Sequence, residues 1–87
     1  MSQLSKDDIF NKIKHILGEQ FEIDSDLIHS NANLYEDLDI DSIDAVNLMI
    51  ELKSITQRKI ALEEFNGVKT INDVVNTVDK ILSERGP

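Results

Sequence analysis

The sequence has no cysteine and no tryptophan, only one proline, and three glycines in 87 residues. Without cysteine the chain can form neither a disulfide framework nor a thiolate zinc site, and this composition fits a reducing compartment. No apolar run approaches the length of a membrane span, and the N-terminal residues lack the basic start and apolar middle of a signal peptide. We therefore expect a cytoplasmic protein without a membrane span.

Basic residues are also scarce. The chain has nine lysines and arginines and 17 aspartates and glutamates, which gives a formal charge of −8. Such a surface repels nucleic acids and anionic membranes, whereas basic protein surfaces are attracted to it. Hydrophobic residues make up 40% of the chain, which is enough for a modest core. We expect one small domain over residues 1–87, ordered over about residues 5–83 and only marginally stable.

Three segments carry apolar residues at the spacing of an α-helix. They cover about residues 5–19, residues 41 or 42 to 56, and residues 70–83. Ser5 is a candidate N-cap of the first segment. Residues 70–73 begin the third segment with threonine and aspartate three positions apart, which resembles a capping box.

The residues between these segments are less regular. Residues 60–65 predict a short additional helix, and residues 24–26 predict a single helical turn. The connection over residues 20–40 is long, and such connections usually pack down with their own side chains or carry function. No stretch shows strand-like alternation. The sequence therefore predicts an all-α fold, a small four-helix bundle of three main helices and one short helix, with a long loop between the first two main helices.

The second predicted helix carries apolar residues on two opposite faces, whereas a surface helix of a small domain needs only one. One face holds Ala45, Leu48, Met49, Leu52 and Ile55. The opposite face holds Ile43, Val46 and Ile50, flanked by Asp44, Asn47 and Glu51. Two interpretations are open. In the first, all eight apolar residues belong to the core, or Ile43 covers its edge. In the second, the second set forms an exposed docking strip rimmed by charge.

The segment over residues 36–44 holds four aspartates, one glutamate and one serine, Ser42. Ser42 lies where the second helix is expected to begin. A helix N-terminus has unpaired N–H groups and the positive end of the helix dipole, so a phosphate ester on Ser42 would be placed favourably. The alternative is that Ser42 only caps the helix.

The same acidic segment also suggests calcium. Counted from Asp37, the first three acidic positions of an EF-hand loop are filled by Asp37, Asp39 and Asp41. The turn glycine is replaced by Ser42 and the bidentate glutamate by Leu48, so two essential features are missing. The pattern disfavours a specific calcium site and leaves weak binding of divalent ions open.

Catalysis has few candidate residues. The chain has no cysteine nucleophile and two histidines, His15 and His29. A serine triad would need His29 to meet Ser42 in a pocket that this small core can hardly supply. His15 is expected on a helix surface or at the edge of the core. We therefore do not expect an enzyme.

Taken together, residues 36–44 resemble the signature of acyl carrier proteins, in which an Asp-Ser-Leu motif opens the second helix. Residues 16–20 resemble the end of the first helix of that family. Residues 31–34 resemble the stretch before its acidic motif, and residues 69–73 resemble the entry to its last helix. The resemblance covers about residues 5–83.

The resemblance implies a function. Ser42, preceded by Asp41, is expected to accept 4′-phosphopantetheine from coenzyme A, transferred by a holo-acyl-carrier-protein synthase. The thiol of that arm holds acyl groups as thioesters. The protein would be a monomeric carrier, not an enzyme, that shelters the acyl chain between its helices. It would present the chain to acyltransferases and ketosynthases with basic docking patches.

The resemblance also assigns two further sets of residues. The expected partner-binding residues are Ile43, Asp44, Val46, Asn47, Ile50 and Glu51. The expected acyl-pocket residues are Leu34, Tyr35, Leu48, Leu52, Ile60, Val68 and Val75.

The sequence departs from the family pattern at several positions. The glycine that usually lies two residues before the motif aspartate is Asp39, the usual leucine after the serine is Ile43, and a common glutamate is Asn47. The end of the second helix, usually acidic with a final phenylalanine, carries Lys53 and no phenylalanine. These departures bear on partner identity. A fatty-acid carrier and a carrier of a specialised lipid, polyketide or polyene pathway both remain open.

A function of another class also remains open at this stage. A small acidic helical interaction module, or a degenerate calcium-binding domain, would explain the charge and the helices with Ser42 as a simple cap.

Overall fold

A computed structural model describes residues 5–57, 60, 62–65 and 67–83 of the chain. It contains three α-helices and two 3-10 helices, which are α1 (Lys6–Gln20), η1 (Ser25–Leu27), α2 (Ser42–Thr56), η2 (Leu62–Phe65) and α3 (Ile71–Ser83). The described residues form no strand, only an isolated antiparallel bridge between Asn33 and Thr70. The all-α fold class is confirmed.

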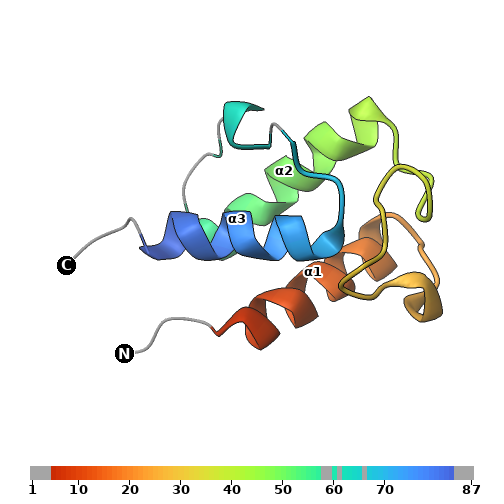
Figure 1. Cartoon of the computed structure of the whole chain (residues 1–87), viewed down its shortest axis with the longest axis horizontal. Helices are drawn as coiled ribbons and strands as arrows, with labels where there is room; N and C mark the ends of the chain where they lie inside the picture. The colour runs from red at the N-terminus through yellow and green to blue at the C-terminus, as the bar shows by residue number, and fades with distance from the viewer. Residues whose placement is uncertain (1–4, 58–59, 61, 66, 84–87) are drawn as a thin grey trace.

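The three α-helices pack against one another, and η2 packs against α3. In Figure 1, α1 runs toward the end of the molecule where the long connection lies, and α2 and α3 run back from that end. The start of α2 is therefore next to the connection. This arrangement places the acidic segment at one end of the bundle.

The predicted caps of the first and last helices are confirmed. The Ser5 Oγ accepts a hydrogen bond from the Asp8 N–H at 3.1 Å, and the Asp8 carboxylate accepts one from the Ser5 N–H at 3.2 Å. The same reciprocal pair joins Thr70 and Asp73, with both bonds at 3.1 Å. Each pair satisfies two N–H groups that a helix start leaves without partners, so both helices begin where local sequence predicts.

The core is built from the apolar stripe of each helix and from the connection. The stripe of α1 contributes Ile9, Ile13, Ile16 and Leu17, and that of α3 contributes Ile71, Val74, Val75, Val78 and Ile81. The connection contributes Ile28, Ala32, Leu34, Leu38 and Ile40, all buried. The long loop therefore packs down with its own side chains, as expected.

Backbone hydrogen bonds fasten the connection to the start of α3. The Leu34 N–H donates to the Lys69 carbonyl at 2.7 Å, and the Ile71 N–H donates to the Ala32 carbonyl at 3.1 Å. The predicted turn at residues 24–26 is also present, as η1 with Asp24 as its N-cap. These backbone bonds hold the connection against the start of α3.

The short fourth helix is not confirmed as an α-helix. Its described part is the 3-10 helix η2, and Ala61 lies outside the described residues. Gln57 ends α2 in the left-handed conformation, with φ of 60°.

None of the helices in the described parts of the chain has both the length and the apolar character that a membrane crossing requires.

Candidate functional site

Asp41, not Ser42, is the N-cap of α2. Its backbone is extended, and its Oδ1 accepts a hydrogen bond from the Asp44 N–H at 2.8 Å. Ser42 is the first helical residue and is exposed. Its hydroxyl has no hydrogen-bond partner among the described residues. The interpretation of Ser42 as a simple cap is therefore wrong, because Asp41 performs that role.

The position of Ser42 suits a phosphate ester. The first turn of a helix presents N–H groups without intrahelical partners and the positive end of the dipole. The Asp41 cap satisfies the Asp44 N–H, and other N–H groups of that turn remain available to an anion. The exposed Ser42 hydroxyl can accept a phosphoryl group without disrupting any bond that holds the helix start together.

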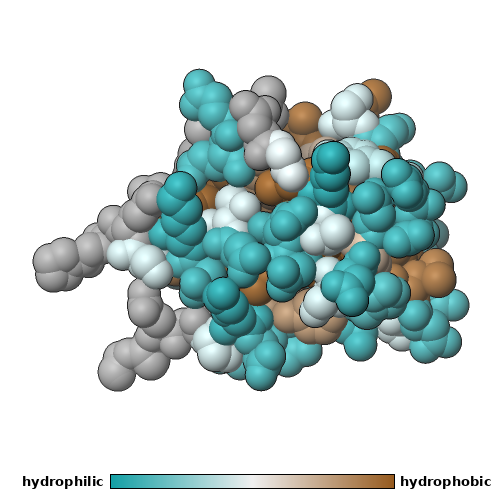
Figure 2. Space-filling model, in the orientation of Figure 1, coloured by the Kyte–Doolittle hydropathy of each residue, from teal (hydrophilic) through white to brown (hydrophobic). Residues whose placement is uncertain are grey.

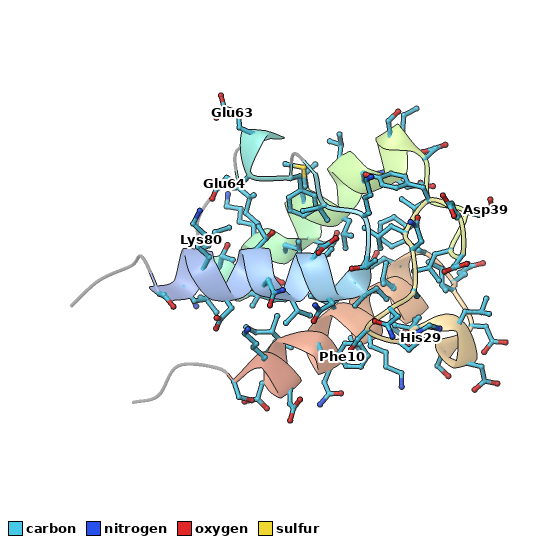
Figure 3. The ribbon with its side chains drawn as sticks, viewed as in Figure 1. Phe10, His29, Asp39, Glu63, Glu64 and Lys80 are labelled. Carbon is cyan, nitrogen blue, oxygen red and sulfur yellow. The ribbon has the colours of Figure 1, made fainter. Side chains whose placement is uncertain are left out.

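The residues just before Ser42 are held firmly. Leu38 and Ile40 are 6% and 4% exposed, and the Ile40 N–H donates to the Leu34 carbonyl at 2.9 Å. Between them Asp39 adopts a φ of 59°, in the left-handed region. Figure 3 shows its side chain at the outer edge of the connection. Glycine, which the signature that residues 36–44 resemble has at this position, fits that backbone, and aspartate is among the few other residues that tolerate it.

The two faces of α2 have opposite environments. Leu48, Met49, Leu52 and Ile55 are buried, whereas Ile43, Val46 and Ile50 are 71%, 44% and 62% exposed. The interpretation that all eight apolar residues are core is therefore wrong. We use the name docking strip for Ile43, Val46 and Ile50.

Acidic and polar residues accompany the docking strip. Asn47 is exposed, and Asp44 and Glu51 are partly exposed. Together with Ile50 these three line a small cleft of about 220 Å³. Gln20 and Phe21, at the end of α1, line the same cleft. Sequence reasoning missed these last two residues, because their place beside α2 depends on how α1 packs.

Six of the seven expected acyl-pocket residues are buried: Leu34, Leu48, Leu52, Ile60, Val68 and Val75. Tyr35 is the exception, with 42% of its surface exposed. Its N–H donates to the Asn33 Oδ1 at 2.9 Å in a tight turn, so Leu34 faces the core and the next side chain faces outward. Tyr35 does not share the environment of the other six residues.

The carboxylates that suggested calcium do not converge. The Asp37 Oδ2 accepts a hydrogen bond from the Asn33 N–H at 2.8 Å, and the Asp41 carboxylate caps α2. Among the described residues, no three acidic or histidine side chains are placed to hold a metal ion. Both histidines, His15 and His29, are exposed.

A small helical bundle that presents an exposed serine at the start of its second α-helix, beside an exposed apolar and acidic face, has the properties of a carrier domain. The profile of the phosphopantetheine attachment site family matches residues 11–78. Acyl carrier protein 2 of Ralstonia nicotianae is 41% identical over 80 residues, covering 92% of this chain and 99% of that protein.

Other relatives agree. The acyl carrier protein of Lactobacillus acidophilus is 39% identical over 75 residues, covering 86% of this chain and 94% of its own length. That of Thermotoga maritima is 31% identical over 78 residues, covering 90% and 96%. The chain therefore belongs to the acyl carrier proteins, the family with a phosphopantetheine attachment site.

Membership of this family defines the activity in general terms. The protein carries acyl groups and does not catalyse their chemistry. Its prosthetic group is 4′-phosphopantetheine, whose thiol supplies the thioester linkage when the group is bound. Its partners include a phosphopantetheinyl transferase and biosynthetic enzymes that act on the carried chain.

Proposed function

We propose that Ser42 is the residue to which the phosphopantetheine arm is attached. The observation that carries this proposal is the exposed Ser42 at the first position of α2, whose hydroxyl has no partner among the described residues because Asp41 performs the capping. A transferase can reach this hydroxyl without unfolding any part of the helix. Asp41 holds the helix start in place and adds negative charge beside the serine.

Intact mass measured before and after incubation with coenzyme A and a broad-specificity phosphopantetheinyl transferase tests this assignment. We expect the wild type to gain one phosphopantetheinyl group and Ser42→Ala to gain none. The matched control is Ser54→Ala, which removes an exposed serine of the same helix and should be loaded like the wild type. Loading of Ser42→Ala, or no loading of the folded wild type, would exclude Ser42 as the acceptor.

The docking strip and its neighbours are the proposed contact surface for the partner enzymes. Exposed apolar side chains beside carboxylates suit an encounter that charge makes fast and a small contact area keeps reversible. Asp44, Asn47 and Glu51 border the strip on the same helix. The partners we propose are the holo-acyl-carrier-protein synthase, acyltransferases and ketosynthases with basic docking patches.

The proposed acyl shelter lies in the core between α2 and α3. Leu48 and Leu52 come from α2 and Val75 from α3, and all three are buried. Leu34, Ile60 and Val68 add buried side chains from the connections. An acyl chain would replace contacts among these side chains with contacts of the same apolar kind, so a small core can accommodate it at modest cost.

The proposal extends to the molecule as a whole. We propose that residues 5–83 act as a single, monomeric carrier domain in the cytoplasm, with η2 as the fourth, short helix of the bundle. The contact between η2 and α3 supports this last point. Acyl chains of fatty-acid or polyketide type are the proposed cargo.

A further inference from the structure

An open groove of about 680 Å³ lies at the end of the molecule where the connection meets α2. Its apolar lining comes from the end of α1 and from the connection: Phe21, Ile23, Leu27, Leu38 and Ile40. Leu38 and Ile40 are buried, whereas Leu27 is 49% exposed. Figure 2 shows apolar atoms on the surface at this end of the molecule. The groove therefore offers apolar surface to a partner.

The other lining residues give the groove a strongly negative rim. Five of them are carboxylates, namely Glu22, Asp24, Asp37, Asp39 and Asp44, and none of its lining residues is a lysine, arginine or histidine. Glu22, Asp24, Asp37 and Asp39 are exposed, and Asp44 is partly exposed. A segment that enters the groove must therefore supply positive charge around an apolar side chain.

The groove is continuous with the surface already described. Gln20, Phe21 and Asp44 line both the groove and the small cleft beside Ile50. Ile40 and Asp44, which line the groove, lie two residues before and after Ser42. An enzyme whose active site reaches Ser42 therefore comes close to the groove.

We propose that this groove is a docking site for the phosphopantetheinyl transferase, which inserts an apolar side chain flanked by lysine or arginine. The proposal rests on Ser42 as the acceptor. It extends the docking surface from α2 to the end of α1 and to both ends of the connection.

Steady-state kinetics of loading, with a purified bacterial holo-acyl-carrier-protein synthase and saturating coenzyme A, tests the proposal. The charge variant is Glu22→Asn with Asp39→Asn. Both positions have positive φ, which asparagine tolerates, so the backbone is kept. The apolar variant is Leu27→Asn, at a half-exposed position. The control pair is Asp7→Asn with Asp79→Asn, in the first turn of α1 and the second half of α3, which changes the net charge equally.

For both groove variants we expect KM for the carrier to rise roughly fivefold at unchanged kcat. The lost contacts would stabilise the bound carrier equally before and during the transfer step. The KM of the charge variant should also depend less steeply on salt. The control pair should keep the wild-type KM to within about twofold. Circular dichroism and urea unfolding establish that each variant is folded.

Several outcomes would overturn the proposal. Unchanged KM in the groove variants would exclude the groove while leaving Ser42 as the acceptor. An equal rise in the control pair would mean that only total charge matters. Self-association of the wild type that Leu27→Asn abolishes would assign the groove to a second copy of the chain. A folded wild type that is not loaded at all would exclude Ser42 and the groove together.

Discussion

At the scale of single residues, Asp41 and Ser42 hold two separate roles at the start of α2. The Asp41 carboxylate satisfies a backbone N–H of the first turn, and Ser42 is exposed, with no partner for its hydroxyl among the described residues. A serine that capped the helix would lose that hydrogen bond when modified, at a cost of about 1 kcal/mol. Because Asp41 is the cap, the proposed loading of Ser42 would leave the helix start intact.

Asp39 should be replaceable by glycine without loss of stability. Its φ of 59° disfavours residues with a Cβ, and asparagine and aspartate tolerate it best. We expect Asp39→Ala to lower the free energy of unfolding by about 1 kcal/mol relative to Asp39→Asn, which has the same charge. Asp39→Gly should be at least as stable as Asp39→Asn. Urea unfolding at fixed ionic strength measures these differences, and equal stability of the Ala and Asn variants would contradict the argument.

Asp73 should make stability depend on acid pH. Hydrogen bonds from the Lys69 N–H at 3.0 Å and the Thr70 N–H at 3.1 Å lower the pKa of the Asp73 carboxyl. A lowered pKa in the folded state gives stability that is present above the unfolded value of about 3.9. That stability is lost as pH falls through the folded pKa.

The comparison variant is Asp73→Asn, which cannot ionise but keeps a side-chain oxygen acceptor. The wild type should exceed it in unfolding free energy at neutral pH, and this difference should shrink as pH falls below about 4. Urea unfolding of both proteins between pH 7 and pH 3 measures it. A difference that stays constant over this range would show that the carboxylate charge contributes nothing at the start of α3.

At the scale of elements, the exposed and buried faces of α2 should respond in opposite ways to the same change. Ile50 is 62% exposed and Leu52 is fully buried. Leu52→Ala should cost about 2–5 kcal/mol of stability, because it leaves a cavity in the core. Ile50→Ala should cost less than about 0.5 kcal/mol, and it should weaken binding to a ketosynthase severalfold.

Urea unfolding and a binding titration with a purified bacterial ketosynthase measure the two effects. Asn11→Ala, at an exposed position of α1, is the control for binding, since it lies on another helix. If Ile50→Ala bound the ketosynthase as tightly as the wild type, the docking strip would not be part of the partner interface.

The helix boundaries show which parts of the fold could be predicted from the sequence alone. The starts of α1 and α3 were predictable, because Ser5, Asp8, Thr70 and Asp73 act within one turn of each helix. The two apolar faces of α2 followed from the spacing of its apolar residues. The burial of each residue was needed to decide whether the second face is core or docking strip. The start of α2 was ambiguous because aspartate and serine are equally good caps.

Other features depend on contacts between distant segments, which local patterns do not encode. The outward direction of the Tyr35 side chain is determined by the turn around Asn33. Asn33 in turn forms a bridge with Thr70, just before α3. The groove likewise exists because the end of α1 meets the connection near Asp44. The pairing of Leu34 with Lys69 joins residues 35 positions apart, so neither feature was accessible to periodicity.

At the scale of the whole molecule, charge opposes compactness. The formal charge of −8 is held in a body with principal extents of 37, 24 and 20 Å. At about 10 mM salt the Debye length is about 30 Å, so carboxylates on opposite faces repel one another. At about 150 mM it is about 8 Å, and most of this repulsion is screened. Unfolding separates these charges, so repulsion destabilises the folded chain most at low salt.

We therefore expect the free energy of unfolding to rise by on the order of 1 kcal/mol between about 10 and 150 mM NaCl. Urea titrations across that range measure the rise. The Asp7→Asn with Asp79→Asn pair has a formal charge of −6, since each change removes one of the negative charges that give −8. It should be more stable than the wild type at low salt and gain less from added salt. Stability that falls with salt would mean that local attraction outweighs overall repulsion.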